Sequence, residues 1–135
     1  MESNFKALTS FAGKYLGKSV RDGECVALFR QYVGEVFNIP HTGSVEGAFD
    51  LWTTYFTNPL MEQYFDRTAD KPQPGDAAIF CPTATNKYGH IAIVVHVDDH
   101  GMACIEQDGF KKELGVKEAF WNWDRYVGAL KAKGG

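Results

Sequence analysis

The sequence predicts an α+β fold in which N-terminal helices pack on an antiparallel sheet. Residues 4–56 carry apolar side chains at helical spacing, whereas residues 77–130 contain short apolar runs typical of strands. The segment Asp98-Asp99-His100-Gly101 separates two of these runs and indicates a hairpin. Helices that come before the strands, instead of alternating with them, are typical of α+β proteins.

One helix is expected before the cysteine-containing helix and one after it. Residues 4–16 repeat apolar side chains at helical intervals, with Ser3 or Asn4 as the N-cap. The spacing of apolar residues over 45–56 predicts another helix. The pattern of apolar residues over 60–71 is irregular.

The second half of the chain predicts strands. Residues 72–76 contain two prolines and a glycine, which form a turn ahead of a strand over 77–81. Further strands are expected over 90–97, 102–108 and 125–130.

Composition excludes several classes of protein. The chain of 135 residues predicts one domain, 1–135, whose residues 131–135 form a polar tail. The net charge of −3 and scattered basic residues argue against nucleic acid as a partner. No apolar run is long enough to span a membrane, and no signal peptide is visible, so we expect cytoplasmic synthesis and no membrane partner. We also expect a monomer.

A single cysteine stands where a turn becomes a helix. Asp22 and Gly23 form the turn, and Cys25 then begins a helix with one apolar face. Unpaired N–H groups and the helix dipole favour the thiolate at this position, which is the nucleophilic form. Cysteine is also among the most buried residue types, so a purely structural role for Cys25 is the alternative.

A nucleophilic cysteine needs a base within hydrogen-bonding distance and a third group to orient that base. His90 is the best-placed base because it opens a strand directly after Gly89. His96 lies further along the same strand, His100 lies in the hairpin turn, and His41 lies in a loop.

Two acids on the returning strand of the hairpin are candidates to orient His90. Glu106 and Asp108 are two residues apart and share one face of the strand. A two-residue turn would put Glu106 opposite Ile93, on the face away from His90. A three-residue turn would put it opposite Val94, on the histidine's face, and the sequence leaves both registers open.

Four motifs in order resemble the CHAP family, the cysteine- and histidine-dependent amidohydrolases/peptidases. They are Gly23-Glu24-Cys25-Val26-Ala27-Leu28, Pro74-Gly75-Asp76, Gly89-His90-Ile91-Ala92-Ile93-Val94 and Ile105-Glu106-Gln107-Asp108. The resemblance implies a papain-like fold and cleavage of an amide bond in bacterial peptidoglycan, as in bacteriophage endolysins and virion-associated lysins. It leaves open whether the enzyme is an amidase or an endopeptidase.

The resemblance also implies roles for individual residues. Cys25 would be the nucleophile, His90 the general base, and Glu106 the group that orients the imidazole. The family commonly has asparagine at the position of Asp108, which would help to position His90 or shape the oxyanion site. It commonly has glutamine at the position of Glu24, whose ionised carboxylate cannot donate a hydrogen bond.

We expect no metal and no cofactor. Some relatives bind calcium through an acidic run before the cysteine, but residues 17–22 contain one acid and two cations.

Aromatic side chains are candidates to line the substrate groove. They are Tyr88, Trp52, Trp121 and Trp123, although core packing is the simpler role for each tryptophan. Two other functions remain open: a non-catalytic wall-binding or phage structural module on the same fold, and a thiol enzyme that acts on a protein.

Overall fold

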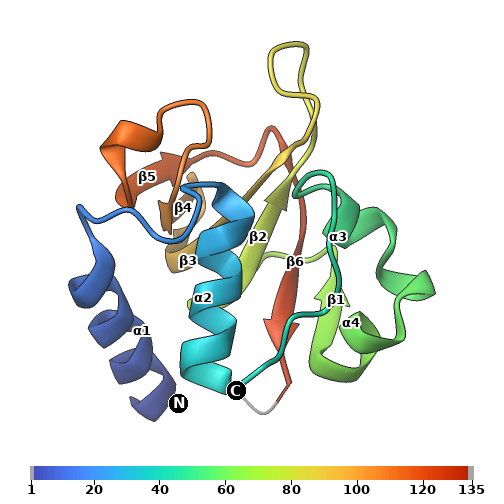
Figure 1. The fold of residues 1–135 in the computed structure, drawn as a ribbon, viewed down its shortest axis with the longest axis horizontal. Coiled ribbons are helices and arrows are strands. Elements are labelled where there is room, and N and C mark those ends of the chain that lie inside the picture. Colours follow the sequence, from blue (N-terminus) through green and yellow to red (C-terminus); the bar gives the residue numbers. More distant parts are fainter. Residues whose placement is uncertain (1, 134–135) are drawn as a thin grey trace.

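Six antiparallel strands form one sheet, with helices along one face of it and at its β1 end (Figure 1). The structure is a computed structural model that describes residues 2–133. The strands are β1 (Phe65–Thr68), β2 (Ala77–Phe80), β3 (His90–Asp98), β4 (Gly101–Glu106), β5 (Lys117–Trp121) and β6 (Tyr126–Ala132). Their order across the sheet is β1-β6-β2-β3-β4-β5. The predicted α+β class is therefore confirmed.

The helical elements come mainly from the first half of the chain. They are α1 (Glu2–Tyr15), α2 (Cys25–Phe37), α3 (Asp50–Thr53), η1 (Tyr55–Thr57), α4 (Pro59–Tyr64) and the later η2 (Lys112–Leu114). Within the described part of the chain, no helix has the length and apolar character needed to cross a membrane.

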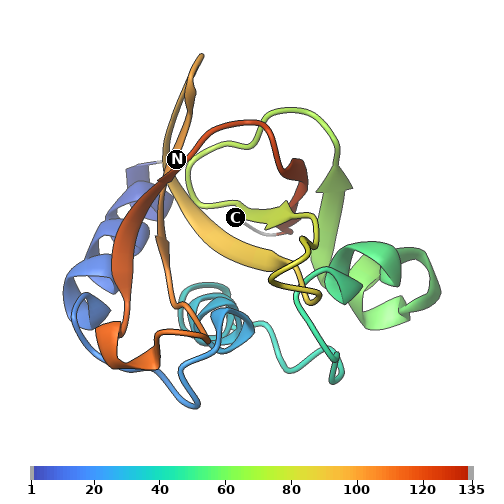
Figure 2. The same ribbon diagram turned by 90° about the horizontal axis from the view of Figure 1, so that it is seen from above.

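Helix α2 lies against the middle of the sheet, while α3 and α4 lie toward the β1 end (Figure 2). Leu28, Phe29 and Tyr32 of α2 are at most 1% exposed and join one apolar cluster with Ile91 and Ile93 of β3. This spacing of three and four residues is the one expected for a helix with one buried face. Packing of α2 against β3 places Cys25, the first residue of α2, near His90, the first residue of β3.

The opposite face of the middle strands is buried as well. A second cluster, formed by Phe80, Val94 and Met102 among others, packs against Trp121 and Tyr126. Phe80 and Trp121 stack with ring centroids 4.5 Å apart. Burial on both faces explains why β2 reads as a continuous apolar run instead of an alternating one.

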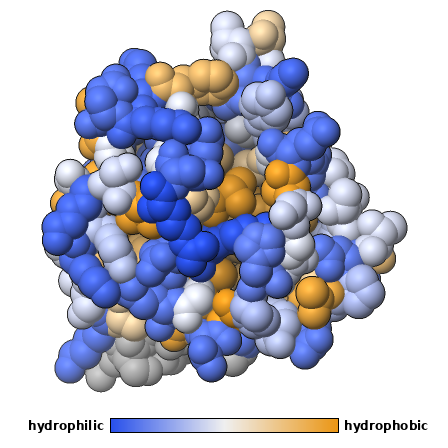
Figure 3. Space-filling view, in the orientation of Figure 1, coloured by the Kyte–Doolittle hydropathy of each residue, from blue (hydrophilic) through white to orange (hydrophobic). Residues whose placement is uncertain are grey.

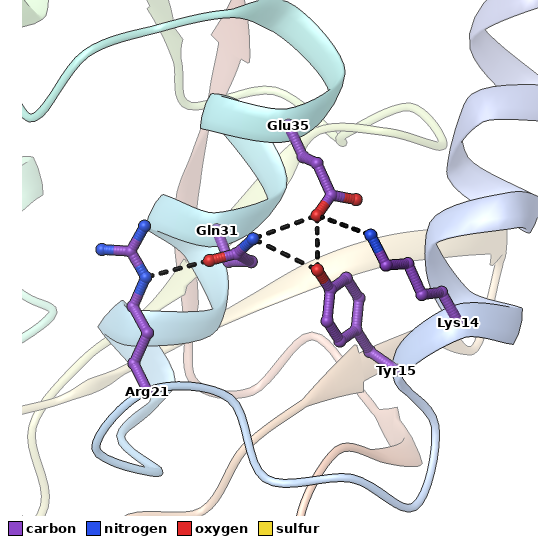
Figure 4. A network of polar contacts seen from close by, with 5 residues as sticks. All are labelled: Lys14, Tyr15, Arg21, Gln31 and Glu35. Atoms are coloured by element: carbon purple, nitrogen blue, oxygen red, sulfur yellow. Dashed lines mark hydrogen bonds and ion pairs between the residues drawn. The ribbon is translucent and has the colours of Figure 1, made fainter.

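A network of polar contacts ties α1 to α2 (Figure 4). Glu35 accepts hydrogen bonds from Lys14 Nζ at 3.2 Å, from Gln31 Nε2 at 3.0 Å and from the Tyr15 hydroxyl. Gln31 Oε1 accepts one from Arg21 Nε at 3.0 Å. The network reaches Arg21 in the loop that leads to Cys25, so it fixes the approach of the chain to the helix.

The predicted helix over 45–56 is wrong in extent, because only α3 and η1 form there. The irregular 60–71 segment contains most of α4 and all of β1. Asn58 caps α4 by accepting the N–H groups of Leu60 at 3.1 Å and Met61 at 3.4 Å, and Pro59 stands at its first position.

The ends of the chain also differ from expectation. Helix α1 begins at Glu2, so Ser3 and Asn4 lie inside its first turn. Residues 131–132 belong to β6 instead of a tail, and residues 134–135 of the predicted tail lie outside the described residues. Strand β5 was not expected.

Candidate active site

Cys25 stands at the first position of α2, beside a cleft of about 580 Å³. Glu24 precedes it as N-cap without a side-chain capping bond, and Asp22 Oδ1 accepts the Glu24 N–H at 3.0 Å. The first N–H groups of a helix have no partner within the helix. Val26 and Ala27 of this first turn line the cleft with Cys25. The thiol therefore lies at the positive end of α2.

His90 lies between Cys25 and Glu106. Its Nε2 is 3.0 Å from Glu106 Oε1. Cys25 and His90 line the same cleft, and interaction with the Cys25 sulfur helps to raise the pKa of His90. Because Nε2 is engaged by the carboxylate, Nδ1 is the nitrogen left for the sulfur. His90 is only 7% exposed. The structure thus brings the three predicted side chains together.

Glu106 is held by more than the histidine. Trp121 Nε1 donates to its Oε1 at 2.6 Å, and Lys117 Nζ lies 3.6 Å from its Oε2. The Trp121 ring also lies close to the His90 ring, with centroids 5.2 Å apart. Both partners come from β5, the strand that the sequence did not predict, so their role in holding Glu106 was missed.

The electrostatics of the pair follow from these contacts. Burial alone lowers the pKa of His90, but the hydrogen bonds and negative charges of Cys25 and Glu106 outweigh it and raise the pKa from 6.5 to about 9. Burial alone raises the pKa of Glu106, but His90, Trp121 and Lys117 together lower it. The favoured state is an imidazolium beside an ionised carboxylate.

The register of β3 and β4 matches neither of the two expected alternatives. The turn has two residues, with Asp98 opposite Gly101, but a β-bulge between Val94 and His96 then shifts the pairing to Ile93 opposite Ile105. Extending this register by one residue puts Glu106 on the His90 face. Glu106 thus lies on the face that a three-residue turn would give, although the turn itself has two residues.

Gln107 is a site residue that the sequence reasoning missed. It is 1% exposed, and its Oε1 accepts the Val20 N–H at 2.6 Å. Its Nε2 donates to Val20 O at 3.1 Å and to Glu24 O at 2.9 Å. The residue after Glu106 therefore fastens the loop that carries Cys25. Its place in the Glu-Gln-Asp motif was the available signal.

Asp108 lies on the cleft, but its recorded hydrogen bond runs to its own loop. Its Oδ1 accepts the Phe110 N–H at 2.9 Å. Glu106, and not Asp108, holds the imidazole in this structure.

Of the four aromatic candidates, Tyr88 lines the cleft and is 42% exposed. The three tryptophans make other contacts. Trp52 stacks on Arg67 at 3.6 Å, Trp121 supports Glu106, and Trp123 Nε1 donates to Asp99 O at 3.0 Å. None of the three tryptophans is among the side chains that line this cleft, so a role for them in substrate binding stays a prediction.

The remaining histidines and cysteines are less suited to catalysis. His96 and His100 are exposed, and His41 lines the cleft from a loop. All three cysteines are free. Cys104 is buried, and burial, with a smaller effect of the Glu106 charge, raises the pKa of its thiol to about 12.

Several segments of the chain line the cleft. The lining comes from the loop before α2 and the first turns of α2, from residues 41 and 45–48, from residues 86 and 88–90, and from residues 108–110. In the view of Figure 3, strongly hydrophilic side chains cross the middle of the molecule, with apolar patches on either side of them. Within residues 2–133, no group of three or more histidine, cysteine, aspartate or glutamate side chains is arranged to hold a metal ion.

Solved structures with a similar fold include Ly7917 and an endolysin. The crystal structure of Ly7917 with the hydrolyzing product of MDP matches with a TM-score of 0.70 and 20% identity, and covers 97% of this chain and 62% of that chain. The wild-type endolysin LysIME-EF1 matches with a TM-score of 0.64 and 17% identity, and covers 94% of this chain and 63% of that chain. This chain thus spans less than two thirds of either structure, and at these identities the likeness shows the fold alone.

The sequence comparisons identify the family. No curated protein sequence matches the chain. The family model of the CHAP domain matches residues 15–108, which include Cys25, His90 and Glu106 and make up most of the chain. The chain belongs to the CHAP domain family.

Proposed function

We propose that this chain is a cysteine-dependent hydrolase that cleaves an amide bond in the peptide part of bacterial peptidoglycan. The observation that carries the proposal is that Cys25 and His90 line one open cleft, with His90 Nε2 held 3.0 Å from Glu106 Oε1. Family membership and the likeness to an endolysin structure support the choice of peptidoglycan as substrate.

The first half of the reaction is acyl transfer to sulfur. The Cys25 thiolate attacks the carbonyl carbon of the scissile amide, and the resulting oxyanion faces the backbone N–H of Cys25 at the start of α2. The His90 imidazolium gives its proton to the leaving nitrogen as the C–N bond breaks. A thioester with Cys25 remains, and the amine product leaves.

The second half releases the acyl group. Neutral His90 takes a proton from water, and the hydroxide attacks the thioester carbonyl. The C–S bond breaks, the carboxylate product departs, and the thiolate and imidazolium are restored. Glu106 keeps Nε2 protonated throughout, so that Nδ1 faces the reacting atoms.

We further propose that the chain acts as one catalytic domain and as a monomer on the bacterial cell wall, as a phage endolysin or virion-associated lysin does. Asp108 contributes to the reaction by shaping the wall of the cleft, which it lines. Two bonds fit the mechanism equally well: the amide between the sugar and the stem peptide, and a peptide bond within the stem or cross-bridge.

The test is digestion of purified peptidoglycan by the wild type and by Cys25→Ala, followed by mass analysis of the soluble fragments. Glycan chains without stem peptides would identify an amidase, and fragments cut within the peptides would identify an endopeptidase. Equal release by both proteins would overturn the proposal. Cleavage of protein substrates without cleavage of the wall would favour a protein-directed thiol enzyme.

A further inference from the structure

The cleft beside Cys25 carries cationic side chains that the proposed mechanism does not use. Arg21, Arg30 and His41 line it together with the thiol. Arg30 lies five residues after Cys25 on α2, which corresponds to about 7.5 Å along the helix axis at about 1.5 Å per residue. These side chains are therefore near enough to contact a substrate held at the sulfur.

Arg30 is held in place with most of its donors unused. Its Nη1 donates to Thr42 Oγ1 at 3.3 Å, and its Nη2 donates to Gly43 O. A guanidinium has five N–H donors, so three remain for a ligand. The two contacts fix the side chain against the loop that contributes His41 to the cleft.

Arg21 is also fixed at one end and open at the other. Its backbone has a φ of 52°, a left-handed conformation that is uncommon outside glycine. Its Nε donates to Gln31 Oε1 at 3.0 Å, while the two terminal nitrogens point away from the network (Figure 4). The terminal nitrogens are the part of a guanidinium that binds a carboxylate side by side.

The three groups lie close enough to affect one another electrostatically. Burial, and then the charge of Arg21, lowers the pKa of Arg30. The charge of Arg30, followed by burial and Arg21, lowers the pKa of His41. Among the side chains that the structure describes, neither guanidinium forms an ion pair with a carboxylate.

Carboxylates also line the cleft, but contacts within the protein engage most of them. They are Asp22, Glu24, Glu46 and Asp108. Glu24 pairs with Lys112 at 3.3 Å, and Asp22 and Asp108 each accept a backbone N–H from their own loops. Arg21 and Arg30 are therefore the cleft side chains that combine a positive charge with unused N–H donors.

We propose that Arg21, Arg30 and His41 form a subsite that binds a carboxylate of the peptide substrate about two residues from the bond that Cys25 attacks. An extended peptide advances about 3.3–3.6 Å per residue, so two residues cover the distance from Cys25 to Arg30. The planar fork of arginine matches a carboxylate in shape and charge. His41 contributes Nε2, because its Nδ1 accepts the Gly43 N–H at 3.1 Å. The choice of a peptide ligand rests on the proposed function.

The test measures binding without turnover. Soluble muropeptides from purified peptidoglycan, with their carboxylates either free or converted to amides, are titrated into Cys25→Ala protein by calorimetry. The same background then receives Arg30→Met, Arg30→Lys or Arg21→Met. Lys6→Met is the matched control, because it removes one positive charge from an exposed position on α1.

Amidation is expected to weaken binding to the Cys25→Ala protein at least tenfold. Arg30→Met and Arg21→Met should each weaken binding of the free-carboxylate form about tenfold and leave the amidated form unaffected. The affinity of Arg30→Lys for the free-carboxylate form should lie between that of the parent and that of Arg30→Met. Lys6→Met should bind like the parent. If Arg30→Met does not fold, Arg21→Met decides the test alone, because its side chain is exposed.

The subsite proposal would be overturned if the arginine variants preferred the free-carboxylate muropeptide over the amidated one as strongly as the Cys25→Ala parent does. It would also be overturned if the parent bound neither muropeptide. Failure of the proposed function would look different. In that case protein with Cys25 intact would leave the muropeptides uncut, while carboxylate-dependent binding persisted.

Discussion

His90 Nε2 lies 3.0 Å from Glu106 Oε1 because a β-bulge corrects the register of the hairpin that joins their strands. The two-residue turn alone would place Glu106 opposite Ile93 and on the other face of the sheet. The extra residue, Val95, shifts the pairing by one, and a shift of one residue moves every following side chain to the opposite face. The bulge thus brings the carboxylate to the imidazole.

Replacing Glu106 by glutamine should lower kcat/KM on muropeptides by roughly two orders of magnitude, within the range typical of losses in acid–base catalysis. The amide cannot stabilise the imidazolium, so the alkaline limb of the pH profile should also move below the wild type's limb near pH 9. Glu118→Gln is the matched control, since Glu118 is exposed on β5. A Glu106→Gln profile that matched the wild type would refute the role of Glu106.

The same pair predicts how stability depends on pH. The pKa of His90 is raised from 6.5 to about 9 in the folded protein, so its charged form contributes stability below pH 6.5 that is lost as the pH rises through 9. The difference in unfolding free energy between wild type and Glu106→Gln should therefore shrink between pH 6.5 and 9. Urea denaturation across this range measures it, and a constant difference would contradict the ion pair.

Gly89 should tolerate no side chain. Its φ is +71°, and an added Cβ would lie 2.8 Å from both Phe49 Cβ and Phe80 O. Gly89→Ala should destabilise the protein by about 1–3 kcal/mol and displace His90, which follows it. Gly13→Ala is the matched control: it lies in α1 with nothing within 4 Å, and should stabilise by about 0.5–1 kcal/mol. Thermal unfolding of both variants measures these effects, and equal outcomes would contradict the account.

Gln107 should couple stability to activity. Replacement by leucine leaves the buried N–H of Val20 without an acceptor, which costs about 1–3 kcal/mol. The Glu24 carbonyl loses one of its two donors and keeps the Leu28 N–H. Because the loop before Cys25 is released, kcat should fall more than KM rises. Gln63→Leu, at an exposed position of α4, provides the comparison in denaturation and kinetic measurements. Unchanged stability of Gln107→Leu would show that the tether is not needed.

The sequence predicted those parts of the site that depend on local signals. Cys25 follows a turn and opens an apolar-faced helix, and His90 opens a strong strand, so both positions could be read directly. The face of Glu106 depended on a bulge at Val95, which leaves no mark in a pattern of apolar residues. The role of Trp121 depended on β5, in which a lysine is half-buried and a phenylalanine is exposed, so apolar and polar residues do not alternate as in a typical strand.

The missed elements have a similar cause. The 45–56 segment has helical spacing, but in the structure its apolar side chains pack around short turns instead of along one helix. In sequence, an Asn-Pro pair such as Asn58-Pro59 is typical of the end of a helix, but in the structure the same two residues cap the start of α4. Local signals mark a boundary here without showing on which side the helix lies.

The most direct test of the central claim is digestion of peptidoglycan in ¹⁸O-labelled water, with intact Cys25 or with Cys25→Ala. The account predicts that the wild type releases fragments that carry one ¹⁸O atom in each new carboxylate, at one type of amide bond, and that Cys25→Ala releases none. Labelled fragments from Cys25→Ala, or wall intact after treatment with the wild type, would contradict it.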